Sequence, residues 1–165
     1  MNIRRAEVKD VPAITAIYND AILHLTVTFI SEPKTLAEQY AWLEAHGDNL
    51  PVLVAEEDGV LLGWASLSKW STLSAYSSTA EASMYMSEGK RNKGIGRKLF
   101  TALMAEGEQA GLHTVIARIV QGNEASIHLC NSLGFTRIGT IKQIGRKFGR
   151  LLDLHMMQFI YPGRD

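Results

Sequence analysis

The sequence predicts an α/β protein built on one mixed sheet, and two patterns carry this prediction. The segments PVLVAEE and VLLGWASLS flank an Asp58-Gly59 pair, which supplies the positive φ angles of a tight hairpin turn. Further on, the strand-like TAEASMYM, a basic glycine loop, a helical repeat and the apolar VIARIV follow one another. A hairpin followed by a strand, loop, helix and strand unit indicates a mixed sheet with helices packed on it.

The N-terminal part is expected to hold a short strand and two helices. An Asp-x-Pro sequence and apolar residues at helical spacing predict the first helix over 11–23. Thr35 with Glu38 three residues later forms a capping-box pattern, which begins a second helix that ends near Gly47. The intervening LTVTFISEP is predicted to cross the molecule without regular structure.

The remaining elements follow from the spacing of apolar residues. Alternation predicts strands, helical spacing predicts helices, and Gly111 and Gly134 end two of these helices. After the hairpin and a polar loop, the expected elements are a strand over 79–87, a helix over 95–110, a strand over 115–120, a helix over 123–133 and strands over 136–144 and 153–161.

Length and composition narrow the function classes. A chain of 165 residues is long enough to bury a sizeable core, so one domain over residues 1–165 is expected. Seventeen Lys and Arg residues balance 17 Asp and Glu residues, and no apolar run is long enough to span a membrane, so neither a nucleic acid nor a membrane is an expected partner. The five histidines lack metal-ligand spacing, so no metal is expected. The lone Cys130 has no disulfide partner, which favours the reducing cytoplasm.

The stretch KRNKGIGRKL, from Lys90 to Leu99, combines five basic residues with two glycines. It completes neither a nucleoside-triphosphate loop, which needs Lys and then Ser or Thr after its second glycine, nor the GxGxxG dinucleotide motif. Small residues that open a helix expose backbone N–H groups, and the helix dipole favours an anion there. A pyrophosphate fits this pattern, and a solvated basic turn is the alternative that spacing alone leaves open.

Three motifs in this order, TAEASMYM, R-x-x-G-x-G and NEASIHLCNSLGF, resemble the GNAT superfamily of acetyl-CoA-dependent N-acetyltransferases. More narrowly, the hairpin and IGRKFGRLLDLHMMQ are similar to the phosphinothricin N-acetyltransferase family, which includes acetyltransferases of methionine sulfone and sulfoximine. The resemblance covers nearly the whole chain. It implies a GNAT fold, in which a mixed, mostly antiparallel sheet is splayed in its middle and carries helices on both faces. It also implies a homodimer.

The same resemblance assigns positions to acetyl-CoA, which would lie between the fourth and fifth strands. The basic loop would meet the pyrophosphate, the preceding strand would pair with the pantetheine arm, and the start of a later helix would complete the site. The matched positions are Tyr85, Met86, Arg91, Asn92, Lys93, Gly94, Ile95, Gly96, Arg97, Asn123 and Ser126.

Acetyl transfer to an amine needs a proton acceptor, an oxyanion donor and a proton for the departing thiolate. Glu81 matches the family's proposed general base, and the alternative is an outward-facing strand glutamate. A backbone N–H near Tyr85 or Met86 is the expected oxyanion donor. Cys130 stands where the family often presents His and the superfamily Tyr, so it is the candidate proton donor, with simple packing as the alternative.

The expected substrate is a small amine that resembles an amino acid. The loop before the catalytic strand lacks the arginines that family members commonly carry, which leaves Phe29, Trp70, Tyr76 and Lys147 as candidate pocket residues. The rival functions are a protein or peptide N-terminal acetyltransferase, a non-catalytic acyl-CoA-binding sensor, and nucleic-acid binding by the basic stretch.

Overall fold

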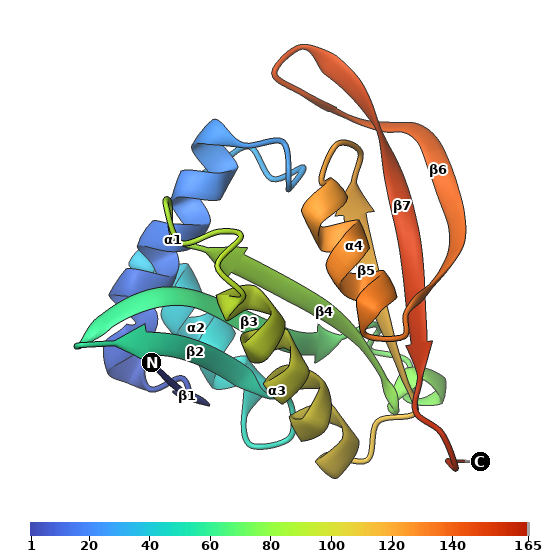
Figure 1. Cartoon of the computed structure of the whole chain (residues 1–165), viewed down its shortest axis with the longest axis horizontal. Helices are drawn as coiled ribbons and strands as arrows, with labels where there is room; N and C mark the ends of the chain where they lie inside the picture. Colours follow the sequence, from blue (N-terminus) through green and yellow to red (C-terminus); the bar gives the residue numbers. More distant parts are fainter. Residues whose placement is uncertain (165) are drawn as a thin grey trace.

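A seven-stranded mixed sheet organises the computed structural model, which describes residues 1–164 (Figure 1). The strand order is β1-β2-β3-β4-β5-β7-β6, and only β4 and β5 run parallel to each other. This confirms the expected mixed, mostly antiparallel sheet. The strands are β1 (Asn2–Arg5), β2 (Val52–Glu57), β3 (Val60–Lys69), β4 (Thr79–Met86), β5 (Thr114–Val120), β6 (Thr136–Lys147) and β7 (Arg150–Ile160).

Helices cover both faces of the sheet: α1 and α2 lie on one face, and α3 and α4 lie on the other (Figure 1). The capping box that predicted the second helix is present, because Thr35 accepts from the backbone N–H of Glu38 and the Glu38 carboxylate accepts from that of Thr35. The helices are α1 (Val11–His24), α2 (Leu36–His46), α3 (Ile95–Gln109) and α4 (Glu124–Ser132), with short 3₁₀ turns η1 (Val8–Asp10) and η2 (Ser74–Tyr76).

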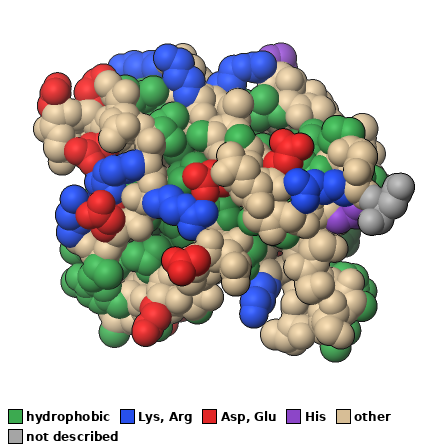
Figure 2. All heavy atoms as spheres, turned by 90° about the horizontal axis from the view of Figure 1, so that it is seen from below, with side chains coloured by type: hydrophobic (Ala, Val, Ile, Leu, Met, Phe, Trp, Pro, Cys, Tyr) green, Lys and Arg blue, Asp and Glu red, His purple; other side chains and the backbone are tan. Residues whose placement is uncertain are grey.

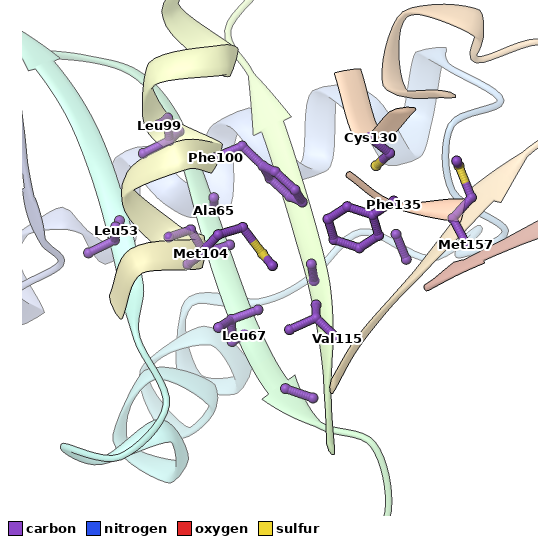
Figure 3. Packing of buried hydrophobic residues seen from close by; sticks show 14 of the residues in the cluster. Leu53, Ala65, Leu67, Leu99, Phe100, Met104, Val115, Cys130, Phe135 and Met157 are labelled. Carbon is purple, nitrogen blue, oxygen red and sulfur yellow. The ribbon is translucent and has the colours of Figure 1, made fainter. Parts of the chain in front are cut away.

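The central strands contribute side chains to two hydrophobic cores, one on each face of the sheet, because successive side chains of a strand point to opposite faces. On the α3 side, Leu53 and Ala65 pack under Leu99 and Phe100, and Phe135 lies 5.8 Å from Phe100 between ring centroids (Figure 3). On the α1 side, Val54 and Trp64 pack against Ile14 together with the rings of Tyr18, Trp42 and Tyr85. The middle of the sheet is therefore fixed from both faces.

The sheet opens between its two parallel strands. Residues Thr79–Ala82 of β4 pair with Thr114–Ala117 of β5, and the pairing stops there. Beyond that point β4 stays paired with β3, and β5 stays paired with β7. The strands β4 and β5 therefore diverge from each other while each remains hydrogen-bonded to its outer neighbour. The splayed sheet implied by the resemblance is thus present.

The last hairpin is longer than predicted, because β6 extends to Lys147 and β7 begins at Arg150. The basic run between them looks like a loop in the sequence, yet only Phe148 and Gly149 form the turn. Their φ angles are 48° and 74°, and positive φ at both central residues is what a two-residue hairpin turn needs. The expected boundaries at residues 144 and 153 were therefore wrong by three residues on each side.

Candidate active site

A cleft of about 510 Å³ begins where β4 and β5 diverge. Its walls come from the end of β4, the loop before α3 and the first turns of α4, and its volume lies in the range of small-molecule sites. Lys93 and Ile95, two of the predicted cofactor positions, are not among its lining residues. The other predicted positions all line it: Tyr85, Met86, Arg91, Asn92, Gly94, Gly96, Arg97, Asn123 and Ser126.

The loop before α3 has the geometry of an anion site. Gly94, with φ 75°, is the N-cap of α3, and a left-handed conformation of this kind suits glycine. The N–H groups of the first helical turn have no intrahelical acceptor, and the positive end of the helix dipole lies beside them. A Cβ at Gly96 would lie 3.2 Å from the Met84 methyl group, so glycine keeps this wall of the cleft open. Lys90 and Arg91 add positive charge to the lining, which suits a pyrophosphate.

The N-terminus of α4 closes the opposite wall. The Asn123 side chain caps this helix, with its Oδ1 atom accepting from the Ser126 backbone N–H at 3.3 Å. The Arg97 guanidinium donates to Ser132 Oγ at 2.7 Å and so ties α3 to α4. These contacts give a local reason for the Asn and Ser of the motif: they start the helix that lines the cleft.

A smaller cavity of about 80 Å³ lies at the base of the divergence. Arg118 and Cys130 are among its lining residues. It shares part of its lining with the larger cleft, so the two spaces adjoin each other. The shared residues are Val27, Met84, Tyr85, Asn123, Ser126 and Leu129.

Glu81 forms a two-point ion pair with Arg118, a residue that the sequence reasoning missed. The Arg118 Nε atom donates to Glu81 Oε1 and Nη2 donates to Oε2, both at 2.7 Å. The pair crosses from β4 to β5 where the pairing ends, since Arg118 directly follows the last paired residue, Ala117. The Arg118 guanidinium also lies 5.8 Å from the centre of the Trp70 ring. An arginine within the otherwise apolar VIARIV was the signal that could have found it.

Two tyrosines lie on the same face as this pair. The rings of Tyr85 and Tyr18 are 4.7 Å apart between centroids, and burial, the largest cause, raises the pKa of both hydroxyls. The Glu81 charge adds to the upward shift of both pKa values. The hydroxyls therefore stay protonated near neutral pH.

Cys130 lies on α4 and is only 4% exposed. Burial raises the pKa of its thiol to about 12, so the thiol stays protonated at neutral pH and is a weak acid. Its position in the lining of the smaller cavity is compatible with the proposed donor role, while its raised pKa makes proton transfer to a thiolate less favourable.

None of the four candidate substrate residues lines either cavity. Trp70 faces Arg118, and Tyr76 is exposed within η2. The Phe29 ring covers Gly145 so closely that a Cβ there would overlap it. Lys147 is 4% exposed and donates to the Thr28 carbonyl at 2.8 Å, and burial lowers the pKa of its ammonium. Phe29 and Lys147 therefore both take part in the contact between the 28–29 segment and β6.

Within residues 1–164, no group of three or more His, Cys, Asp and Glu side chains is arranged to hold a metal ion. None of the helices in this range combines the length and apolar character needed to cross a membrane. Figure 2 shows basic and acidic side chains interspersed on one face of the molecule, in keeping with the balanced composition.

A mixed sheet that splits beside a glycine-marked anion loop defines an acetyltransferase of the GNAT class. The family model described as acetyltransferase (GNAT) domain matches residues 3–156, and the chain belongs to this family. The fold and enzyme class expected from the sequence are therefore confirmed.

Comparison with individual proteins shows which members of the family the chain resembles. An L-methionine sulfoximine/L-methionine sulfone acetyltransferase of Pseudomonas paraeruginosa is 42% identical over 159 residues, which cover 95% of this chain and 92% of the relative. The crystal structure of a ribosomal-protein-alanine N-acetyltransferase from Brucella melitensis has a TM-score of 0.94 at 41% identity, covering 98% of this chain and all of that one. A Sinorhizobium meliloti phosphinothricin acetyltransferase in complex with AcCoA has a TM-score of 0.93 at 33% identity, covering 96% of this chain and 87% of that one.

Proposed function

We propose that the protein transfers an acetyl group from acetyl-CoA to the α-amine of a small amino-acid-like substrate of the methionine sulfoximine, methionine sulfone or phosphinothricin type. The observation that carries this proposal is the placement of Glu81 at the opening of the sheet, next to a cleft whose far end is a helix N-terminus suited to a pyrophosphate. The names of the similar proteins support the substrate class.

The residues of the cleft fit acetyl-CoA. Arg91, Gly94 and Gly96 would meet the pyrophosphate through the loop and the first turn of α3, where backbone N–H groups and positive charge lie together. Past Ala82, alternate backbone N–H and C=O groups of β4 point into the divergence and can pair with the amides of a pantetheine arm. Bound there, acetyl-CoA supplies an activated acetyl group as a thioester.

The chemistry asks three things of the protein. Glu81 accepts the proton that the amine loses when its nitrogen bonds to the acetyl carbon and the carbon–sulfur bond breaks; both of its oxygens keep a lone pair that Arg118 does not use. A backbone N–H of β4 near Tyr85 stabilises the oxyanion that forms on the acetyl oxygen. A donor, for which Cys130 is the candidate, then protonates the CoA sulfur, so that the products are an amide and free CoA.

Replacing Cys130 with Ala is expected to lower turnover by at most about ten-fold, because a buried thiol of raised pKa is a weak acid and general acids contribute more when their pKa lies near the working pH. Initial rates of CoA release at saturating acetyl-CoA measure this. A loss of about 10²-fold, with acetyl-CoA binding unchanged, would instead establish the thiol as the main proton donor.

The function is tested by following free CoA thiol with purified protein. The substrate panel holds phosphinothricin, methionine sulfoximine, methionine sulfone, ordinary amino acids and short peptides that begin with alanine. Saturable release with a sulfoximine, sulfone or phosphinothricin substrate is the expected result. Release with peptides alone would replace the proposal with protein N-terminal acetylation, and binding of acetyl-CoA without release on any substrate would favour a sensor.

We also propose that the protein works in the cytoplasm as a homodimer. The single cysteine suits a reducing compartment. The hairpin of β6 and β7 carries several exposed large apolar side chains, and a second copy of the chain is the partner we propose for it. These side chains are Ile138, Ile141, Ile144, Phe148 and Leu151.

A charge placed on this hairpin is expected to dissociate the dimer. Ile144, 55% exposed, is the position to change, and Ile144→Glu should shift the sedimentation equilibrium from dimer to monomer because burying a carboxylate in an apolar contact is costly. Val60→Glu is the matched control, since Val60 is 61% exposed at the turn between β2 and β3. A monomeric parent protein, or a dimer that survives Ile144→Glu, would contradict the proposed interface.

A further inference from the structure

The Arg118 guanidinium has two edges, and Glu81 occupies only one of them. The edge formed by Nε and Nη2 donates to the two Glu81 oxygens at 2.7 Å each. Within the described residues 1–164, Nη1 makes no hydrogen bond. A guanidinium carries five N–H donors in a fixed plane, so the edge formed by Nη1 and Nη2 remains able to take a second carboxylate in two-point fashion.

The position of this free edge matters as much as its chemistry. Arg118 is half exposed, with 49% of its side chain accessible, and it is the one charged residue among the described lining of the smaller cavity. Trp70 lies against the guanidinium face and limits the directions in which the side chain can swing. An anion that enters the divergence of the sheet therefore meets a cation that is already oriented.

The other cations considered for the site are engaged elsewhere. The Lys147 ammonium is buried against the Thr28 carbonyl and lines neither cavity. Lys90, Arg91 and Arg97 line the larger cleft at the end that suits the pyrophosphate. Arg118 is thus the cation that lies next to Glu81, the residue proposed to take the amine proton.

We propose that Arg118 is a specificity-determining residue that binds the substrate carboxylate through its free edge while its other edge holds Glu81 beside the amine. This inference rests on the proposed function, and it narrows the substrate to amines that carry a free carboxylate close by. An α-amino acid presents an amine and a carboxylate on one carbon, which matches a glutamate and an arginine that are bonded to each other. A peptide N-terminus lacks that carboxylate and leaves the free edge without a partner.

The test compares methionine sulfone with its α-carboxamide, which keeps the amine and removes the negative charge. In the parent protein, kcat/KM for CoA release should favour the free acid. Arg118→Gln should lower kcat/KM for the acid by about 10²-fold, mainly through KM, and should change that for the carboxamide much less. Arg118→Lys should recover only part of the loss, because lysine keeps the charge and loses the two-point geometry. Comparing each substrate across variants cancels the different basicity of the two amines.

Arg5→Gln is the matched control, since Arg5 forms a comparable pair with Glu106 away from both cavities, with Nη2 at 2.6 Å from the carboxylate. It should leave both kcat/KM values within about two-fold. Equal losses for acid and carboxamide in Arg118→Gln would overturn the inference, because they would mean that Arg118 acts only through Glu81.

A binding measurement separates this inference from the proposed function. Calorimetric titration of methionine sulfone and its carboxamide into the protein saturated with CoA needs no turnover. Tighter binding of the acid in the parent protein, lost in Arg118→Gln, supports the inference whether or not acetyl transfer occurs. Binding without turnover would overturn the proposed function alone, and an absence of preference for the acid would overturn the role of Arg118.

Discussion

Replacing Glu81 with Gln is expected to lower turnover by about 10²-fold or more, because a neutral amide cannot take the proton that the attacking amine must lose. The side chain keeps its length, and its oxygen can still accept from Arg118, so the local packing should persist. Acetyl-CoA binding should stay close to that of the parent protein, since Glu81 is not among the residues that line the larger cleft. Turnover by CoA release and affinity by calorimetry measure the two effects.

The control is Glu106→Gln, which removes the negative charge from a second arginine–glutamate pair, between Arg5 of β1 and Glu106 of α3. It should leave turnover within about two-fold of the parent value, since surface changes of this kind are nearly neutral. Unchanged turnover in Glu81→Gln would remove the base assignment. A loss of turnover accompanied by a lower unfolding temperature would point to a folding role, so thermal unfolding of both variants completes the comparison.

Replacing Trp64 with Ala is expected to lower the free energy of unfolding by about 3–5 kcal/mol, the usual cost of emptying a large buried aromatic site. Trp64 is 2% exposed, and its ring lies 5.4 Å from that of Tyr18, 5.3 Å from that of Trp42 and 5.0 Å from that of Tyr85. Because Tyr85 also lines the cleft, the cavity left by the indole should loosen β4 at the site as well.

Urea unfolding followed by circular dichroism measures this loss. Tyr40→Ala is the control, because Tyr40 is a 40% exposed aromatic of α2 and its removal should cost far less, about 1 kcal/mol or below. A cost for Trp64→Ala no larger than that of the control would show that this core is able to collapse around the missing ring.

Local signals in the sequence were sufficient for most elements of the fold. The Asp58-Gly59 turn and the capping box at Thr35 each fix a boundary through chemistry within a few residues, and both predictions are confirmed. The strands of the β6–β7 hairpin were predicted too short, because the turn uses Phe148 and Gly149 in place of the Asn-Gly or Asp-Gly pair that usually marks such turns.

The residues of the site also fall into those that local sequence patterns predicted and those that they did not. The motifs that carry the family resemblance are local patterns in the sequence, and through that resemblance they led to nine of the residues that line the cleft. The pair of Glu81 and Arg118 depends on which strands become neighbours and on where their pairing stops, and these residues are 37 positions apart. Alternation along a strand tells which face a side chain takes, but it does not say which side chain on the next strand will meet it.

The divergence of β4 and β5 has a consequence for how the protein avoids unwanted association. A strand edge with unpaired backbone groups is a template for other chains and a common start of aggregation. Here the stretches that do not pair with each other, residues 83–86 and 118–120, lie in the middle of the sheet between β3 and β7, and α4 and the loop before α3 form walls of the cleft beside them. The protein therefore has two strand edges whose backbone groups can pair with a bound ligand, and neither of them is an outer edge of the sheet.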